Sequence, residues 1–456
     1  MHKKIRDENI LQSTIEFLAY PLPAEIKQAI SDGNYKLAKK RITNYLELKI
    51  PQDMEDRLKY ELNRMAQIKS IYLYTEKKAK IILKKKLSNF RIADFKDWFD
   101  DGYLDHVYLN GKYLYFSRFF DNLLFLNPAL SGQKIVKTKK AEQANNLLNV
   151  RIDKIKMGEV LKYRITAGIR ISLKNAELYR VWLPIPLDDG IIDNVKILKT
   201  EPEHTEISNN SAQNTIYFES IAANFYVEFQ YDISEFSLNE KNSYYRKNQK
   251  FNIADMLTEK YPHVIFTPYL KKLTENIVLN EQDPFKKAKK IYDWITENVR
   301  YTYVPDYFLF DNISEYTATS LRGDCGMMSL LLITMSRIAG IPAKWQSGWY
   351  ITPYNTTLHD WTQLYIEPYG WIPVDPSFGN IIKNKNEKRR NFYFGNLDAF
   401  RMIANEDYQV DFDPPKKYWR SDPVDNQRGE VETEFENVYP DKFKYKILIK
   451  KFEILH

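Results

Sequence analysis

The residues that could carry out chemistry are a cysteine, a histidine and an aspartate that follow one another in the second half of the chain. Cys325 is the single cysteine among 456 residues and stands between Asp324 and Gly326. His359 lies 34 positions after Cys325, and Asp375 lies 16 positions after His359. Nucleophilic catalysis by a thiol needs a nearby base and a third group that orients the base. The order therefore predicts acyl transfer with Cys325 as nucleophile, His359 as base and Asp375 as orienting group.

The cysteine is predicted to stand at the start of a helix. Residues 327–339 have helical apolar spacing, and Gly340 and Pro342 end the pattern. Asp324 is suited to cap such a helix. The helix dipole and the unpaired amides of the first turn lead us to expect a lowered pKa for the Cys325 thiol and donors for an oxyanion. Tyr301 and Tyr303 are candidates for a side-chain donor to the oxyanion.

The histidine and the aspartate are predicted to lie on neighbouring strands. Residues 359–367 alternate in polarity, residues 368–370 form a turn, and residues 371–376 read as a returning strand. The register between the strands stays open, because loop length and bulges shift the pairing. Trp361 is expected to shield the imidazole or to line a substrate cleft.

These segments together resemble the transglutaminase-like core over about residues 282–380. The resemblance rests on the glycine-flanked cysteine, the helix end, the His-Asp-Trp strand and the Gly-Trp to Asp-Pro return, at 323–326, 340–343, 359–361 and 370–376. It implies a papain-like fold and a Cys-His-Asp triad that attacks an amide carbonyl, releases an amine and holds an acyl-enzyme. Asp425-Asn426-Gln427-Arg428-Gly429-Glu430 resembles a segment that follows the core in bacterial relatives.

The remaining sequence predicts the domain organisation. Residues 1–125 have mainly helical apolar spacing, with an Asn110-Gly111 turn that is typical of a tight hairpin. Residues 150–240 contain short alternating segments, which favour a β-sandwich. We therefore predict an α+β protein with an N-terminal helical region, a β-sandwich, a papain-like catalytic core at 250–400 and a C-terminal strand extension at 401–456.

Three functions remain open at this level. The favoured one is thiol-dependent acyl transfer at peptide or protein amides, with hydrolysis preferred slightly over glutamine-lysine cross-linking because hydrolysis needs no amine site. A protease with a defined cleavage sequence differs from it only in substrate. The alternative from another class is a non-catalytic binding or assembly module with a vestigial triad.

Composition and motifs limit the kinds of partner and ligand that we expect. A net charge of +7 from 67 basic and 60 acidic residues comes with no nucleic-acid recognition motif, so we expect no nucleic-acid partner. We expect no membrane span, because every apolar run is interrupted early, and no metal or cofactor, because no ligand cluster is legible. The residues from Met1 to Glu8 are followed by Glu16 within the first apolar stretch, so we expect no export signal and a cytoplasmic protein by default. A leader that had been removed would leave the same sequence.

Overall fold

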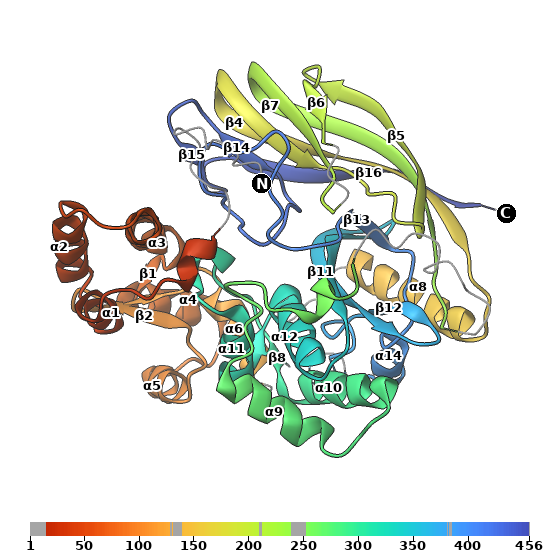
Figure 1. Ribbon diagram of the computed structural model, residues 1–456, viewed down its shortest axis with the longest axis horizontal. Helices are drawn as coiled ribbons and strands as arrows, with labels where there is room; N and C mark the ends of the chain where they lie inside the picture. The colour runs from red at the N-terminus through yellow and green to blue at the C-terminus, as the bar shows by residue number, and fades with distance from the viewer. Residues whose placement is uncertain are drawn as a thin grey trace.

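The computed structural model describes residues 15–127, 130, 139–208, 212–238, 252–380, 382 and 385–455. The stretch from Met1 to Glu8 lies outside these residues. Helices and sheets both build the fold, so the predicted α+β class is confirmed (Figure 1). Within the described ranges, the helices are all too short or too polar to cross a bilayer.

The N-terminal region is a group of helices beside the core (Figure 1). Its helices are α1 (Ala24–Ser31), α2 (Tyr35–Leu46), α3 (Gln52–Ile71), α4 (Glu76–Lys86), α5 (Ile92–Asp100) and α6 (Phe119–Leu126). A small sheet lies among them, formed by β1 (Tyr74–Thr75), β2 (His106–Leu109) and β3 (Lys112–Tyr115). Asn110 and Gly111 join β2 to β3 with φ values of 46° and 86°, which is the backbone that a tight hairpin turn requires. On the side facing the core, Arg64 of α3 donates to the carbonyl oxygens of Phe308 and Phe310 at 2.6 and 3.0 Å.

The region predicted as a β-sandwich differs from a self-contained pair of sheets. In the described residues it belongs to one seven-stranded sheet, ordered β15-β14-β4-β7-β5, with β16 also on β4 and β6 on β7. The strands are β4 (Lys162–Pro184), β5 (Ile192–Glu201), β6 (Glu206–Ile207), β7 (Thr215–Ser234), β14 (Glu430–Glu432), β15 (Asn437–Val438) and β16 (Lys444–Leu455). Alternate residues of β7, such as Val227 and Phe229, are buried together with Trp349 and Trp361 of the core. The apolar face of this sheet therefore packs on the core sheet rather than on a second sheet of its own.

The core packs helices on a four-stranded antiparallel sheet ordered β12-β11-β10-β13. The strands are β10 (Ala343–Ile351), β11 (Thr356–Ile366), β12 (Gly370–Val374) and β13 (Arg401–Asn405). The surrounding elements are α9 (Pro268–Val278), α10 (Pro284–Asn298), β8 (Arg300–Tyr301), α11 (Ile313–Ser320), β9 (Arg322–Gly323), α12 (Cys325–Ile338) and α14 (Glu387–Phe392), with α8 (Lys139–Lys156) against α14. Buried apolar residues of α12 form one cluster with the apolar residues of α10 and of the sheet, so α12 is the central helix.

The residues after position 400 divide between the two large sheets. β13 completes the core sheet, whereas β14, β15 and β16 join the seven-stranded sheet. The stretch predicted as one strand extension at 401–456 thus ties the core to the larger sheet, because its strands pair with both. The predicted domain limits, 1–125, 150–240, 250–400 and 401–456, stay predictions.

Candidate active site

Cys325 is the first residue of α12, as the sequence predicts. Asp324 caps the helix with a side-chain oxygen that accepts from the Met327 amide at 3.1 Å. Gly323, one residue earlier, pairs with Tyr301 in the short parallel ladder of β8 and β9, which fixes the approach of the chain to the helix. The cysteine is 8% exposed. The thiol is therefore held at a capped helix N-terminus inside the core.

A glycine next to the cysteine allows close packing at this point. A Cβ on Gly326 would lie 2.2 Å from Oη of Tyr307 and 2.9 Å from Oδ2 of Asp360. Contacts this short require a neighbour to move. The phenol of Tyr307 in turn donates to Oδ1 of Asp324 at 2.6 Å. Gly326 thus lets a tyrosine, the helix cap and a strand residue converge on the first turn of α12.

His359 and Asp375 form a buried hydrogen-bonded pair. His359 lies on β11 opposite Gly348, and Asp375 directly follows β12, so the two residues stand on neighbouring strands as predicted. Nε2 of His359 lies 2.7 Å from Oδ2 of Asp375. The other oxygen of Asp375 accepts from the Phe378 amide at 2.8 Å. The contact orients the imidazole and fixes which of its nitrogens faces the carboxylate.

The pKa of Asp375 is well below its ordinary value despite full burial. Burial by itself raises the pKa, but the charge of and hydrogen bond from His359, together with the Arg401 guanidinium, outweigh it and bring the pKa to about 2. Arg401 donates from one nitrogen to Asp375 at 3.0 Å and from another to Asp398 at 2.9 Å. Asp375 is therefore an anion throughout the neutral range.

Aromatic rings surround the imidazole and the arginine. The ring of Phe378 lies 4.2 Å from the His359 ring, and the Trp361 ring stacks on the imidazole with centroids 5.8 Å apart. The guanidinium of Arg401 lies 4.8 Å from the Phe378 ring and 4.9 Å from the Trp361 ring. Trp361 thus has the shielding position that the sequence predicts, while Phe378 and Arg401 carry no motif that singles them out in the sequence.

The thiol itself hydrogen bonds to Asp360, the residue next to His359 on β11. Sγ of Cys325 donates to Oδ2 of Asp360 at 3.0 Å. The backbone amide of Asp360 also faces the sulfur. The thiol of Cys325 therefore contacts β11 at residue 360, one position after His359.

A second carboxylate reaches this contact through an amide side chain. Nε2 of Gln427 donates to Oδ1 of Asp360 and, at 2.9 Å, to Oδ2 of Asp425. The carbonyl oxygen of Gln427 accepts from the Trp349 indole at 2.7 Å, which ties the tail to β10. The tail segment at residues 425–430, which resembles a feature of bacterial relatives, therefore contacts the carboxyl group that accepts from the thiol. Only that resemblance marked Gln427 in the sequence.

The electrostatics of the thiol differ from the expectation. Burial, and then the Asp360 and Asp324 carboxyls, raise the pKa of Cys325 well above its ordinary value. Burial and the neighbouring Asp425 and Asp324 likewise raise the pKa of Asp360, and burial raises the pKa of Asp324 to about 6. Burial and these acids outweigh the lowering of the Cys325 pKa that was predicted from the helix dipole. The sequence does not reveal that buried acids gather around the sulfur.

Two tyrosines flank the nucleophile. Burial first, and then nearby acids and Cys325, raise the pKa of Tyr307 far above its ordinary value, and burial followed by Cys325 does the same for Tyr301. Both phenols therefore remain protonated donors. Tyr301 stands near the cysteine as the sequence predicts, whereas Tyr307 was missed because it lies outside any recognised motif.

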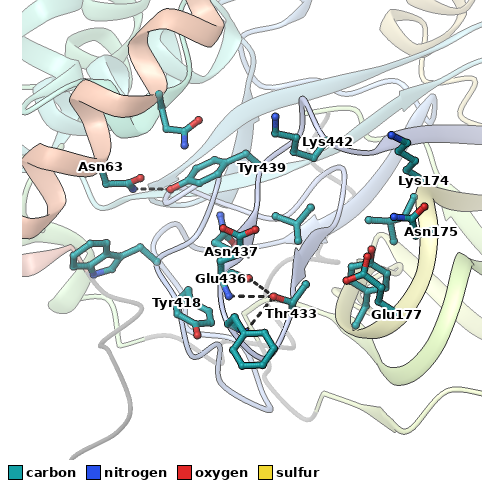
Figure 2. A pocket seen from close by; sticks show the side chains of 16 residues that line it. Asn63, Lys174, Asn175, Glu177, Tyr418, Thr433, Glu436, Asn437, Tyr439 and Lys442 are labelled. Carbon is teal, nitrogen blue, oxygen red and sulfur yellow. Dashed lines mark hydrogen bonds between the residues drawn. The ribbon is translucent and has the colours of Figure 1, made fainter.

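Open cavities lie between the helical region and the tail. One of about 620 Å³ is lined by Asn63 of α3, by β4 residues such as Tyr179 and by tail residues such as Phe435 and Tyr439; Figure 2 shows the Asn63–Tyr439 hydrogen bond across it. A second, of about 300 Å³, shares Gln67 and Tyr439 with the first.

The smaller cavity is lined by residues that are next in the chain to two residues of the site. Its lining includes Asp306, which precedes Tyr307, and Arg428, which follows Gln427. Arg428 lies 3.4 Å from Asp306 across the cavity wall. A chain bound here would contact neighbours of the two residues that bond to Asp324 and Asp360.

The sequence of this chain is similar to those of known proteins. Residues 271–376 match the sequence model of the transglutaminase-like superfamily. An uncharacterised protein of Bacillus subtilis, YebA, is 24% identical over 157 residues, which cover 29% of this chain and 20% of that protein. An uncharacterised protein of Haemophilus influenzae is 23% identical over 225 residues, 42% of this chain and 60% of that protein.

Solved structures are also similar to this chain. A candidate cysteine protease from Cytophaga hutchinsonii aligns with a TM-score of 0.38 and 13% identity, over 65% of this chain and 90% of that one. The present chain spans less than two thirds of either curated relative. The matched segment contains Cys325, His359 and Asp375. Residues 271–376 are thus similar to the core of the transglutaminase-like superfamily.

Proposed function

We propose that the protein is a thiol-dependent acyl transferase that acts on peptide or protein amide bonds through Cys325, His359 and Asp375. The buried contact of 2.7 Å between His359 and Asp375, on the strand whose next residue hydrogen bonds to the thiol, carries the proposal. A nucleophile, a base and a group that orients the base are the parts that this chemistry needs.

The proposed reaction begins with attack of the sulfur on the amide carbonyl. The proton of Sγ passes to Nδ1 of His359, since Nε2 is engaged with Asp375. The bond between sulfur and carbon forms, and backbone amides at the N-terminus of α12 stabilise the oxyanion. The imidazolium returns its proton to the departing amine, and a thioester remains on Cys325. Asp375 keeps the imidazole oriented and favours its charged form.

Resolution of the thioester decides between the two main outcomes. Attack by water, activated by His359, gives hydrolysis, and attack by a lysine amine gives a cross-link. We favour hydrolysis, because it needs no binding site for a second substrate. The cavities between the helical region and the tail offer room for a peptide or protein substrate that extends away from the scissile amide.

The reaction can be tested with a peptide library and a small primary amine. Mass spectrometry of the products from wild type and from Cys325→Ala would reveal peptides that gain the amine, peptides that are cut and glutamines that are deamidated. Leu48→Ala, an exposed change in the helical region, serves as a control for handling of the protein. Products that depend on Cys325 support acyl transfer, and their type identifies its class. Identical product profiles from wild type and Cys325→Ala contradict it.

A non-catalytic module remains the second candidate, and one observation favours it. The thiol donates to a buried carboxyl, and its pKa is raised, which is the opposite of an activated cysteine. In such a module Cys325 would resist alkylation at every pH at which the protein stays folded.

A further inference from the structure

The contact between Cys325 and Asp360 places an acid group directly on the candidate nucleophile. Sγ and Oδ2 are 3.0 Å apart, and both side chains are buried. One hydrogen atom fills this space: it belongs either to the sulfur, with an ionised carboxylate accepting it, or to the carboxyl, which then donates to a thiolate. The two forms differ only in which atom holds the proton.

The surroundings of Asp360 favour keeping a proton there. Asp425 and Asp422 face it from the tail, and Asp324 faces it from the start of α12. Gln427 donates to its other oxygen. Tyr301 and Tyr307 also face Asp360, and Tyr307 donates to Asp324. Arg428, next to Gln427, lies beside Asp306. Across the described residues, no lysine or arginine forms an ion pair with Asp360 within 4.0 Å.

We propose that Asp360 is a further catalytic residue, whose protonated carboxyl donates to the sulfur of Cys325 and so sets when the thiol can react. When Asp360 is ionised, its carboxylate holds the proton on sulfur and opposes the thiolate. When Asp360 is protonated, its hydroxyl donates to the sulfur and stabilises the thiolate that attack requires. The role in turnover rests on the proposed acyl transfer, but the control of thiol reactivity does not.

The proton balance of the reaction is then complete. Asp360 enters with its own proton and donates a hydrogen bond to sulfur. The thiol proton moves to His359, the bond between sulfur and the acyl carbon forms, and His359 passes its proton to the leaving nitrogen. Water, deprotonated by His359, releases the acyl group, and sulfur regains a proton. Asp360 ends with the proton that it held at the start.

The sign of the pH dependence follows from this balance. Burial and three facing carboxyls raise the pKa of Asp360 above its ordinary value. Asp360 therefore stays protonated to a higher pH than an exposed aspartate, and turnover falls as the pH rises through that raised pKa.

The single cysteine makes a direct test possible, since any alkylation occurs at Cys325. The rate of modification by iodoacetamide is measured from pH 5 to pH 9 for wild type, Asp360→Asn and Asp189→Asn. Asp189 is the matched control: it is partly buried, with its pKa raised to about 7, but its carboxyl accepts from Gln346 and not from the thiol. Asp360→Asn keeps a hydrogen-bond donor and removes the charge. It should speed alkylation by about tenfold or more, the equivalent of one pKa unit, at the high-pH end of the range, where Asp360 of the wild type is ionised, while the control keeps the wild-type profile.

A second variant keeps the test decisive if Asp360→Asn fails to fold. Asp425→Asn removes the facing carboxyl that most raises the pKa of Asp360 after burial. Asp360 then ionises at lower pH, so the fall in turnover at high pH moves to lower pH, opposite to the effect of Asp360→Asn. Superimposed profiles for wild type and both variants would overturn the inference.

The two proposals fail in different ways. A shifted alkylation profile without any turnover would contradict the proposed acyl transfer and support control of the thiol by Asp360. Turnover that depends on Cys325, with profiles indifferent to Asp360→Asn, would leave acyl transfer and remove the role of Asp360.

Discussion

Oδ2 of Asp375 receives two hydrogen bonds, one across 2.7 Å from Nε2 of His359 and one across 3.0 Å from the guanidinium of Arg401. The carboxylate that orients the imidazole is thus itself fixed by a buried cation. A second nitrogen of the Arg401 guanidinium donates to Asp398. The relationship extends the candidate site by one residue that neither spacing nor motif indicates.

Replacement of Asp375 should show whether the charge of its side chain, and not only its volume, is needed for catalysis. Asp375→Asn keeps the volume but loses the charge that favours the imidazolium, so we expect kcat to fall by about 10²-fold or more with KM little changed. Steady-state kinetics on a peptide substrate measures this. A fall in kcat/KM that is confined to KM would contradict an orienting role.

The same carboxylate should contribute to stability in a defined pH window. Its pKa is near 2 in the folded protein and near 3.8 in an unfolded chain, so it stabilises the fold above about pH 4, and this contribution is lost as the pH falls toward 2. The difference corresponds to about 2 kcal/mol. Urea unfolding of wild type and Asp375→Asn at pH 7 and pH 3 should show a gap that narrows in acid. An equal gap at both pH values would argue against the buried ion pair.

Loss of Arg401 should destabilise the core. Arg401→Met leaves Asp375 and Asp398 buried without their cation, and removal of one partner of a buried ion pair costs about 3–5 kcal/mol. Arg401→Lys, which keeps the charge, is the matched control and should recover part of the loss. Chemical denaturation provides the free energies of unfolding. A change of less than about 1 kcal/mol for Arg401→Met would be incompatible with the geometry.

Close packing at Gly326 leads to a prediction about activity. Gly326→Ala places a methyl group 2.2 Å from Oη of Tyr307, so the tyrosine or the first turn of α12 must shift. We expect alkylation and turnover to fall by at least about tenfold, because a displacement near 1 Å is enough to disrupt a catalytic arrangement. Removal of the phenol hydroxyl in Gly326→Ala/Tyr307→Phe should restore part of the rate. No recovery would show that the clash lies elsewhere.

The larger cavity should matter for long substrates only. Phe435 is 80% exposed at its rim. Phe435→Ala should raise KM for peptides that extend beyond the scissile amide and leave short amides and Cys325 alkylation unaffected. Ile92→Ala, at an exposed site of the helical region away from the cavity lining, is the control. Equal effects on short and long substrates would exclude binding of the substrate in this cavity.

Much of the core was predictable because its signals are local. Asp324 and Gly340 bound the Cys325 helix through capping chemistry, and the alternation around His359 together with the turn at Gly370 indicated the hairpin that brings Asp375 close. The Asn110-Gly111 turn was equally legible. Each of these features depends on residues within a few positions of one another.

The remaining features depend on contacts between distant segments. Asp360 and Gln427 are 67 positions apart, and no local pattern foretells that they meet behind the thiol. The partner of the β4–β7 face was also hidden, since an alternating strand reveals that one side is buried but not against which sheet. The raised pKa of Cys325 follows first from burial and then from the Asp360 and Asp324 carboxyls beside it, which is why the helix dipole alone misled.

The central claim, a covalent acyl transfer at Cys325, is tested most directly by the intact mass of the protein after an acid quench during turnover of a peptide amide. The account predicts an added acyl mass on the peptide that contains Cys325, removed by hydroxylamine, absent in Cys325→Ala and formed far more slowly in His359→Gln. Turnover that continues in Cys325→Ala without any adduct on the wild-type protein would contradict it.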